Sequence, residues 1–379
     1  MSDIATLEPA TPETANSTES GLLLDSLEIE NFRCFRHLVI PKLGRVNLIT
    51  GKNNVGKSTL LEAIYVACRQ NKLQALRSIL SYRQEIPGFL PPNSDTLKSE
   101  LKYEKNFFPY VNNIFYNRIF DGIGEFYVKT SNNKVTFSIF SENIFHEEEK
   151  ILNAKPNPEF YIAVSSEGKI DGILKIEDFL TNYETREIKL LDSIQFIRLF
   201  SPVGSSIDSI WDEISLTGKE SVVIRYMKNF IPGIERIGFR NSNYEALRRP
   251  YVKLENIDAP VPLRNFGDGA HRIFHIATSL TSCQNGICLI DEIDNGIHYS
   301  VLRDVFRFLL TISAKYNIQI ICTTHSRECI EAFQEIASSD SDPNSGMLIR
   351  LANHDGGIIA TNFDEEDLGV MTRRGLEVR

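Results

Sequence analysis

The sequence lacks the features that mark membrane, secreted and metal-stabilised proteins. No apolar run approaches the roughly 18–20 residues of a membrane-spanning helix, and residues 1–20 have neither a basic residue nor the apolar stretch of a signal peptide. The six cysteines form no C-x-x-C pair, so we expect reduced, apolar core residues and not disulfides or zinc ligands. A sustained heptad pattern is also missing, which argues against a long coiled-coil arm. These absences predict a cytoplasmic globular protein without a membrane segment.

The composition is that of an ordinary globular protein with a surplus of acid. The 379 residues are enough for one large domain or two, and 42% of them are hydrophobic. A net charge of −9 disfavours non-specific binding along a nucleic-acid backbone, although it leaves room for a local basic face. Four acids lie among Ser, Thr, Pro and Ala in residues 1–20. We therefore expect residues 1–24 to form a disordered acidic tail.

A phosphate-binding loop is the most specific motif in the chain. Residues 51–58 read Gly-Lys-Asn-Asn-Val-Gly-Lys-Ser, a complete G-x-x-x-x-G-K-S pattern between an apolar run at 46–50 and a helical pattern that follows. A strand, a glycine-rich turn and a helix start direct several backbone N–H groups at one anion, so this loop is expected to hold the phosphates of ATP. Lys57 would reach the β- and γ-phosphates. The predicted nucleotide-binding residues are Asn53, Asn54, Val55, Gly56, Lys57, Ser58 and Thr59.

Hydrolysis needs a carboxylate for Mg²⁺ and a group that positions the attacking water. Asp291 and Glu292 end a buried apolar strand, so Asp291 with the Ser58 hydroxyl is expected to hold Mg²⁺ and Glu292 to act on the water. His325 ends another apolar strand. Because parallel strands bring their carboxyl ends to one crevice, Lys57, Glu292 and His325 should meet there as the catalytic residues. The alternative is that these residues merely end strands.

A second glycine pair suggests another anion site. Gly267, Asp268 and Gly269 precede a helical pattern that starts near Ala270. Free N–H groups and a positive dipole end at this point would attract an anion. Since the chain already has one phosphate loop, this second site is expected to bind the nucleotide of another molecule. A helix cap with a tight turn is the alternative reading.

The remaining patterns predict an α/β protein whose core is assembled from both ends of the chain. Alternation and turn residues predict strands at residues 27–32, 46–50, 125–130, 134–140, 160–165, 170–176, 234–239, 251–254, 286–290 and 319–324, with two more between 346 and 360. Helices are predicted at about 60–70, 205–230, 270–282 and 299–314. Trp211, the only tryptophan, is expected in the core. We expect a core of residues 25–75 and 260–379 around a central β-rich and helical insertion at 76–259.

With these elements in this order, the chain resembles the ABC-class ATPases. It is most similar to the branch of SMC, RecF and OLD-type defence proteins, often grouped as AAA family ATPases. The similar segments are an N-terminal strand at 29–35, a Walker A motif at 51–59, a Walker B motif with its D-loop at 289–298, and a switch-histidine motif at 323–326. The resemblance is strong over about 25–75 and 260–335, and looser elsewhere.

The resemblance implies an ABC-type core, in which helices flank a mixed sheet. It also implies a head-to-head dimer with two ATP molecules, each between the Walker A motif of one chain and the signature loop of the other. ATP would close this dimer and hydrolysis would release it. Two departures stand out. The signature loop reads Phe-Gly-Asp-Gly-Ala from Phe266 instead of Leu-Ser-Gly-Gly-Gln, and no Q-loop glutamine is evident.

The C-terminal end bears on the kind of partner. OLD nucleases carry a TOPRIM nuclease domain, but only residues 326–379 follow the switch histidine, which is too short for one. The acidic clusters there, at Asp340 and Asp342 and at 364–367, are expected to be solvated surface. A nuclease or toxin activity would therefore come from a separate effector protein.

Three functions fit these observations. The first is an ATP-hydrolysing dimeric switch, which uses the insertion to sense or hold a partner in bacterial anti-phage defence; assemblies larger than a dimer stay open. The second is a DNA-binding repair or maintenance ATPase of the RecF and SMC kind, with candidate basic residues at Lys98, Lys102, Lys105, Arg248 and Arg249. The third is a scaffold that binds ATP and barely hydrolyses it; the presence of Glu292 argues against this function.

Overall fold

The computed structural model of the protein describes most of the chain: residues 22–86, 108–118, 124–141, 159–181, 193–198, 207–242, 245–338, 346–364, 367 and 370. Several predictions fall outside these residues. They concern Lys98, Lys102, Lys105, Asp340, Asp342, Glu365, Glu366 and residues 1–21 of the expected acidic tail.

The nucleotide-binding core is built on a six-stranded mixed sheet. Neighbouring strands are parallel from β14 through β8, and β15 runs antiparallel at one edge. The strand order is β15 (Gly357–Phe363), β14 (Gly346–His354), β3 (Val46–Thr50), β13 (Gln319–Thr323), β12 (Ile287–Ile290) and β8 (Ile194–Ile197). Strands this apolar can be buried on both faces, which is what parallel sheets require.

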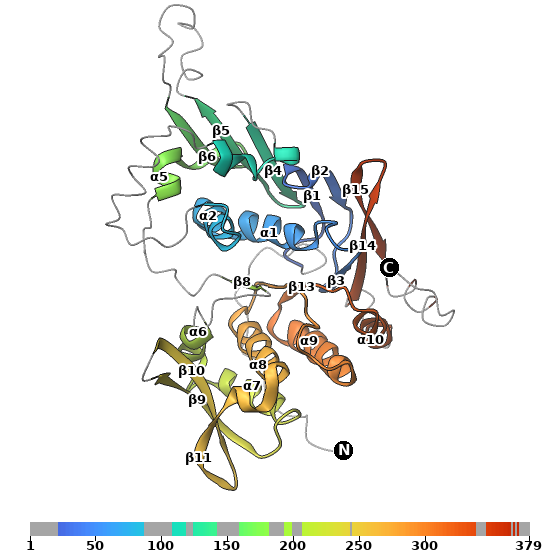
Figure 1. The fold of residues 1–379 in the computed structure, drawn as a ribbon. Coiled ribbons are helices and arrows are strands. Elements are labelled where there is room, and N and C mark those ends of the chain that lie inside the picture. Colours follow the sequence, from blue (N-terminus) through green and yellow to red (C-terminus); the bar gives the residue numbers. More distant parts are fainter. Residues whose placement is uncertain are drawn as a thin grey trace, which may run out of the picture.

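Helices and a second sheet cover the two faces of this central sheet (Figure 1). Successive residues of one strand enter different hydrophobic clusters: Leu48 points into one and Ile49 into the other. One face is covered by α1 (Lys57–Cys68) and α2 (Lys72–Tyr82). The other is covered by α8 (Gly267–Ser282), α9 (Leu302–Tyr316) and α10 (Arg327–Ala337). The core is therefore layered, with the sheet between two sets of helices.

The second sheet is antiparallel and lies beyond α1 (Figure 1). Its order is β2 (Phe35–Ile40), β1 (Leu27–Phe32), β4 (Gly124–Thr130), β5 (Lys134–Ser141), β6 (Phe160–Ser166) and β7 (Lys169–Lys175). Both hairpins that the sequence predicted are present. Aromatic rings build its inner face; the Phe126 and Phe137 rings stack with centroids 4.7 Å apart. Short helices α4 (Phe108–Asn112), η1 (Tyr116–Arg118) and α5 (Ile176–Thr181) accompany it.

A third, three-stranded sheet lies on the α8 side of the molecule (Figure 1). It consists of β9 (Ile234–Ser242), β10 (Glu245–Leu254) and β11 (Ile257–Pro262). It packs with α6 (Ile207–Ile214) and α7 (Gly218–Met227), and Trp211 is buried in the same cluster, as predicted. The helical stretch predicted at 205–230 is two helices, because Leu216 takes a left-handed φ of 64° between them. The 3-10 helices η4 (Leu263–Phe266) and η5 (Tyr299–Val301) precede α8 and α9.

The interval 76–259 does not separate cleanly from the core. Helix α2 crosses the expected boundary at residue 76, and β8 is an edge strand of the central sheet beside β12. Strands β4 to β7 extend the sheet that β1 and β2 begin. The three strands β2, β8 and β11 were not predicted. An independent insertion domain therefore stays a prediction. Strands from the interval pair with strands of both core segments, since β4 pairs with β1 and β8 pairs with β12.

Candidate functional site

The phosphate loop connects β3 to α1, and two glycines give it its shape. Gly51 has a φ of 141° and Gly56 a φ of 88°, both in the region that favours glycine. A Cβ atom on Gly51 would lie 2.3 Å from the Leu351 backbone oxygen, and one on Gly56 would lie 2.6 Å from Cys34 Sγ. No side chain caps the start of α1. The first N–H groups of the helix are therefore available to an anion.

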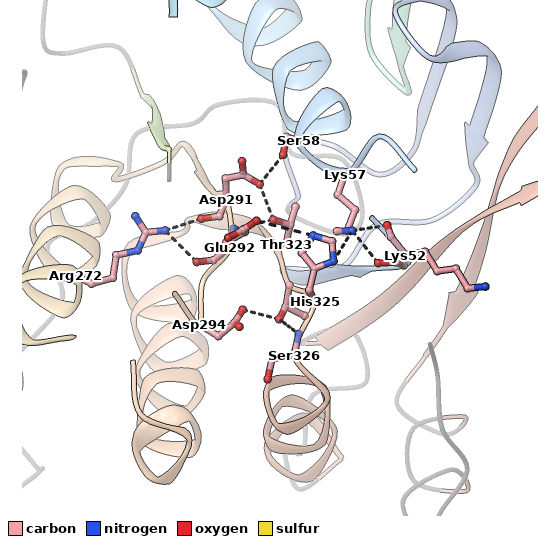
Figure 2. A network of polar contacts seen from close by, with 12 residues as sticks. Lys52, Lys57, Ser58, Arg272, Asp291, Glu292, Asp294, Thr323, His325 and Ser326 are labelled. Carbon is pink, nitrogen blue, oxygen red and sulfur yellow. Dashed lines mark hydrogen bonds and ion pairs between the residues drawn. The ribbon is translucent and has the colours of Figure 1, made fainter. Parts of the chain in front are cut away.

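The Lys57 ammonium lies over this loop. Its Nζ donates to the backbone oxygens of Gly51 at 2.8 Å and Lys52 at 2.9 Å, and lies 3.1 Å from His325 Nδ1 (Figure 2). Burial lowers the pKa of Lys57 to about 8, against the opposing effect of Asp291 and Glu292. At neutral pH the group is still mostly charged, so a cation is held where phosphates would meet the loop.

Ser58 and Asp291 are joined directly, although 233 residues separate them. Ser58 Oγ donates to Asp291 Oδ1 at 3.0 Å, and Thr323 Oγ1 donates to the same oxygen at 2.7 Å (Figure 2). A hydroxyl and a carboxylate are the hard oxygen ligands that Mg²⁺ takes, and this ion fills its other positions with water and phosphate oxygens. Within the described ranges, no group of three or more His, Cys, Asp or Glu residues forms an all-protein metal cage. The donor set therefore fits Mg²⁺ bound together with a nucleotide.

Glu292 and His325 face each other across the site. Glu292 has a left-handed φ of 47°, and its N–H donates to Thr323 Oγ1 at 2.8 Å. Its Oε1 lies 3.9 Å from His325 Nε2. Burial and the nearby Lys57 lower the pKa of His325, so the imidazole is neutral at neutral pH. A carboxylate and a neutral imidazole thus flank the point towards which Lys57 is directed.

Sequence reasoning missed the residue that anchors this turn. Arg272, on α8, donates through Nη2 to the backbone oxygens of Asp291 at 2.6 Å and Glu292 at 3.2 Å (Figure 2). Its Nη1 donates to the backbone oxygen of Arg198 at 3.2 Å. A second anchor is Asp294, which accepts from Thr324 Oγ1 at 2.6 Å. Arg272 lies in the helical pattern that follows Gly267–Gly269, but only the fold reveals that its side chain reaches the backbone of Asp291 and Glu292.

The second predicted anion site is built differently. Gly267 starts α8 with a φ of 89°, and no side chain caps this start. A Cβ atom on Gly269 would lie 2.7 Å from the Gly296 backbone oxygen, so the helix start packs against the turn after Glu292. Among the described residues, no hydrogen bond joins Gly267, Asp268 or Gly269 to the phosphate loop of the same chain. The fold therefore brings together Lys57, Ser58, Asp291, Glu292 and His325, and leaves the second site apart.

The comparison with protein families decides the class. Residues 46–331 match the family described as "AAA domain, putative AbiEii toxin, Type IV TA system". The chain belongs to this AAA family. The match spans both the phosphate loop and the acid pair, and it confirms the resemblance to AAA-type ATPases of the ABC class. The expected α/β core, a mixed sheet flanked by helices, is also confirmed. This family member is accordingly an ATPase of the AAA type.

The chain is also similar to individual proteins. An "ATP/GTP phosphatase" of Helicobacter pylori is 26% identical over 373 residues, which cover 91% of this chain and 97% of the relative. The "DNA replication and repair protein RecF" of Thermomicrobium roseum is 41% identical over 54 residues, 14% of each chain. Among solved structures, the Smc head domain of Pyrococcus furiosus bound to the C-terminal domain of ScpA is 11% identical. The match covers 93% of this chain and 99% of the Smc chain, with a TM-score of 0.47.

In the part of the chain that the structure describes, no helix is both long and apolar enough to span a bilayer. Four of the six cysteines, Cys283, Cys288, Cys322 and Cys329, are buried as predicted, whereas Cys34 and Cys68 are partly exposed; all six are free thiols.

Proposed function

We propose that the protein is a cytoplasmic ATP-driven dimeric switch, the ATPase component of a bacterial anti-phage defence system that controls a separate effector. The ATPase part of this proposal rests on one observation: three segments that are distant in the sequence converge at one site. Lys57 Nζ lies 3.1 Å from His325 Nδ1, and Ser58 Oγ lies 3.0 Å from Asp291 Oδ1. Such a set of groups suits in-line attack of water on the γ-phosphate of ATP.

Each group has one task in this reaction. The Glu292 carboxylate orients the attacking water and accepts its proton, because its strained turn directs it into the site. Lys57 neutralises charge that develops on the phosphate oxygens, and the first N–H groups of α1 hold the β-phosphate. His325 is neutral and its Nδ1 accepts from the Lys57 ammonium, so its Nε2–H would donate to the γ-phosphate. Ser58 and Asp291 would hold Mg²⁺, which when bound supplies Lewis-acid stabilisation of the phosphate oxygens.

Support for the dimer comes from the start of α8. Gly267, Asp268 and Gly269 lie at a helix start without a side-chain cap, apart from the phosphate loop of their own chain. In the proposed dimer they contact the γ-phosphate bound by the other chain. Arg272 would then link this contact to Glu292, since it holds the backbone oxygens of the acid turn. Nucleotide would close the dimer and hydrolysis would open it.

The biological assignment rests on the family description, which names a toxin of a toxin–antitoxin system. The relative described as an ATP/GTP phosphatase adds GTP as a second substrate to test. An effector outside this chain remains our proposal, as does the use of residues 76–259 to sense or hold it.

The test is turnover and assembly of Glu292→Gln. Without a carboxylate to accept the proton, phosphate release should fall by roughly 10²–10⁴-fold. ATP binding should persist, so the variant should run as a dimer with ATP and as a monomer with ADP in size-exclusion chromatography with light scattering. Glu331→Gln, on the exposed face of α10, is the matched control and should behave as wild type. Normal turnover by Glu292→Gln would refute the catalytic assignment; a monomer under ATP would refute only the dimer.

The alternative is a RecF-like or SMC-like ATPase that acts on DNA. It is favoured by the RecF similarity over 54 residues. One of its candidate residues, Arg248, is ion-paired with Asp212, where Nη2 and Oδ1 are 3.1 Å apart, so it is committed within the fold. Duplex DNA that stimulates ATP turnover in a strongly salt-dependent way would favour this alternative over an effector switch.

A further inference from the structure

Strand β8 lies at the edge of the central sheet, beside the strand that leads to the acid pair. It has four residues, and among the described strands its one neighbour is β12. Its last residue, Ile197, accepts through its backbone oxygen from the Asp291 N–H at 2.9 Å. The next residue, Arg198, accepts through its backbone oxygen from Arg272 Nη1 at 3.2 Å. The end of β8 therefore holds the backbone of Asp291 both directly and through Arg272.

The Arg198 side chain lies among three aromatic rings, which we call the aromatic cage. Its guanidinium carbon is 4.4 Å from the ring centroid of Tyr82, 4.9 Å from that of Phe196 and 5.7 Å from that of Tyr65. The Tyr65 and Phe196 rings also contact each other, with centroids 5.6 Å apart. Tyr65 belongs to α1, Tyr82 to α2 and Phe196 to β8. The aromatic cage therefore fastens the end of β8 to both helices that cover this face of the sheet.

Packing alone does not explain a charged side chain in the aromatic cage. Arg198 makes no ion pair with a described carboxylate, and burial lowers its pKa, against the opposing effect of Tyr65 and Glu62. Withdrawing a cation from water costs free energy, whereas a methionine would fill the same space without that cost. Attraction between the cation and the ring faces offsets part of it and strengthens as the cation is desolvated. Because a planar guanidinium stacks on aromatic faces, Arg198 fixes the direction of β8 more narrowly than an aliphatic side chain would.

Helix α1 connects the aromatic cage to the other side of the proposed magnesium site. Tyr65 lies two turns, or about 10 Å, beyond Ser58 in this helix. Ser58 is one expected magnesium ligand, and Asp291, whose backbone is held by the end of β8, is the other. Arg198 thus joins the two elements that supply these ligands. Its distance from the start of α1 also means that it acts through the backbone and not on the phosphates.

The aromatic cage also joins the two ends of a long stretch of chain. Helix α2 ends at Tyr82, and the chain returns to the central sheet at β8. The described elements between these points include β4 to β7 and α5. The exit point is fixed to α1 as well, since Arg83 Nε lies 2.6 Å from Oε1 of the buried Glu62. A displacement of this stretch would therefore reach the acid pair through the end of β8.

We propose that Arg198 is a positioning residue, which sets the placement of the acid pair relative to Ser58. It acts through the two backbone oxygens at the end of β8 and through Arg272. Without its charge the end of β8 can shift, and a misplacement of about 1 Å in a catalytic group costs up to about 100-fold in rate. The inference rests on the proposed ATP hydrolysis. It adds the route by which the chain between α2 and β8 controls that reaction.

The first test needs neither ATP nor magnesium. In Arg198→Met the side chain keeps its length but loses its charge, so the hydrogen bond from the Asp291 N–H to β8 should open more often. We expect hydrogen–deuterium exchange at the Asp291 N–H, resolved by fragmentation, to become about 10-fold faster. The Ile287 N–H, which donates to the Ser193 backbone oxygen just before β8, is the internal reference and should change little. Unchanged exchange at Asp291 would overturn the proposal.

The second test separates positioning from nucleotide binding. Arg198→Met should lower kcat about 10-fold and raise the Mg²⁺ concentration for half-maximal turnover by a similar factor, because Asp291 is displaced. ATP affinity without Mg²⁺ should stay unchanged, since Lys57 is untouched. Arg198→Lys and Tyr82→Phe keep the cation and the ring, so both should retain most of the rate, whereas Tyr82→Leu should lose it. A loss of ATP affinity as large as the loss of kcat would make Arg198 a nucleotide ligand and contradict the proposal.

Arg240→Met is the matched control. Arg240 also lies over an aromatic ring, that of Tyr251 at 5.4 Å, but on the three-stranded sheet, so this variant should behave as wild type. Circular dichroism and thermal unfolding check that each variant folds, and Tyr82→Leu replaces Arg198→Met in both tests if the latter does not. Lower stability with unchanged Mg²⁺ dependence would reduce Arg198 to a structural contact and overturn its positioning role.

Glu292→Gln distinguishes failure of this inference from failure of the proposed function. If Glu292→Gln stops turnover while Arg198→Met leaves kcat and Mg²⁺ dependence unchanged, only the positioning role is wrong. If Glu292→Gln turns over normally, the hydrolysis assignment is wrong, and the exchange measurement at Asp291 still decides whether Arg198 holds the acid turn.

Discussion

Helices α1 and α8 both begin at a glycine loop without a side-chain cap, yet their surroundings differ. The start of α1 has no acid in its first turn and is bordered by Lys57 and by Asp291, which follows β12. The start of α8 has Asp268 in its first turn and packs against Gly296. Open N–H groups alone do not make a phosphate site, since nearby charge decides whether an anion is attracted. The start of α1 has a cation from its own chain beside it. The start of α8 has none there, so we expect it to contact a phosphate only when another molecule holds that phosphate.

Removing the cation from the first helix start should have the largest effect. Lys57→Ala should lower ATP turnover by roughly 10³-fold, because a preorganised donor to the phosphates is lost. Binding of a fluorescent ATP analogue, followed by titration, should fall with it. Lys52→Ala is the matched control, because Lys52 is exposed and only its backbone oxygen contacts Lys57. Equal nucleotide affinity in Lys57→Ala and Lys52→Ala would remove the basis for distinguishing the two helix starts.

The link between the two helices is tested through Arg272. Arg272→Lys keeps the charge but cannot reach the Asp291, Glu292 and Arg198 carbonyls together. Loss of about 2 kcal/mol of hydrogen bonding corresponds to a kcat roughly 30-fold lower. We expect KM for ATP to stay unchanged, since the phosphate loop is untouched; steady-state phosphate release gives both constants. Arg264→Lys, an exposed residue just before α8, serves as control. A rise in KM alone would place Arg272 in nucleotide binding instead.

The pH dependence should differ between nucleotide affinity and folding. The pKa of Lys57 is about 8, so ATP affinity should weaken about 10-fold per pH unit above that value as the ammonium loses its proton. The effect on stability has the opposite sign. Between pH 8 and the ordinary pKa of 10.5 the unfolded chain binds more protons at this lysine, so its contribution to the free energy of unfolding rises with pH.

Two measurements against Lys57→Gln separate these trends: isothermal titration of ATP and thermal unfolding, each from pH 7 to about 10. Wild type should lose affinity while it gains stability relative to the variant. ATP affinity that stays unchanged over this range relative to the variant would mean that the ammonium is not a phosphate ligand, and a loss of stability would mean that its pKa is not lowered by folding.

The smallest effect concerns the charge at the second helix start. Asp268→Asn removes an acid beside the position where the proposed dimer brings a triphosphate. Dimer affinity of the ATP-trapped Glu292→Gln protein should increase by a few-fold, corresponding to 0.3–1 kcal/mol, as measured by analytical ultracentrifugation. If the start of α8 is only a cap, dimer affinity will not change, and the monomer will lose a similar amount of stability.

Sequence patterns predicted the parts that depend on local rules. The strand–loop–helix order around Lys57 and the hairpins at 124–141 and 160–175 are confirmed because turn chemistry and alternation act over a few residues. Strand β8 was missed, since four residues carry too little periodicity to recognise. Strand β11 was missed because Pro260 and Pro262 are atypical of strands, and it tolerates them near the sheet edge.

What the sequence determined by itself is the chemistry: a phosphate loop, an acid pair and a histidine, each at the end of an apolar strand. The tertiary structure alone decided which distant residues meet. Arg272 reaches the carbonyls of Asp291 and Glu292 across a helix–strand packing, and the two arginines at 248 and 249 are sent to opposite faces by a strand register. The reason is physical, because local periodicity fixes the direction of a side chain, whereas its partner depends on how whole elements pack.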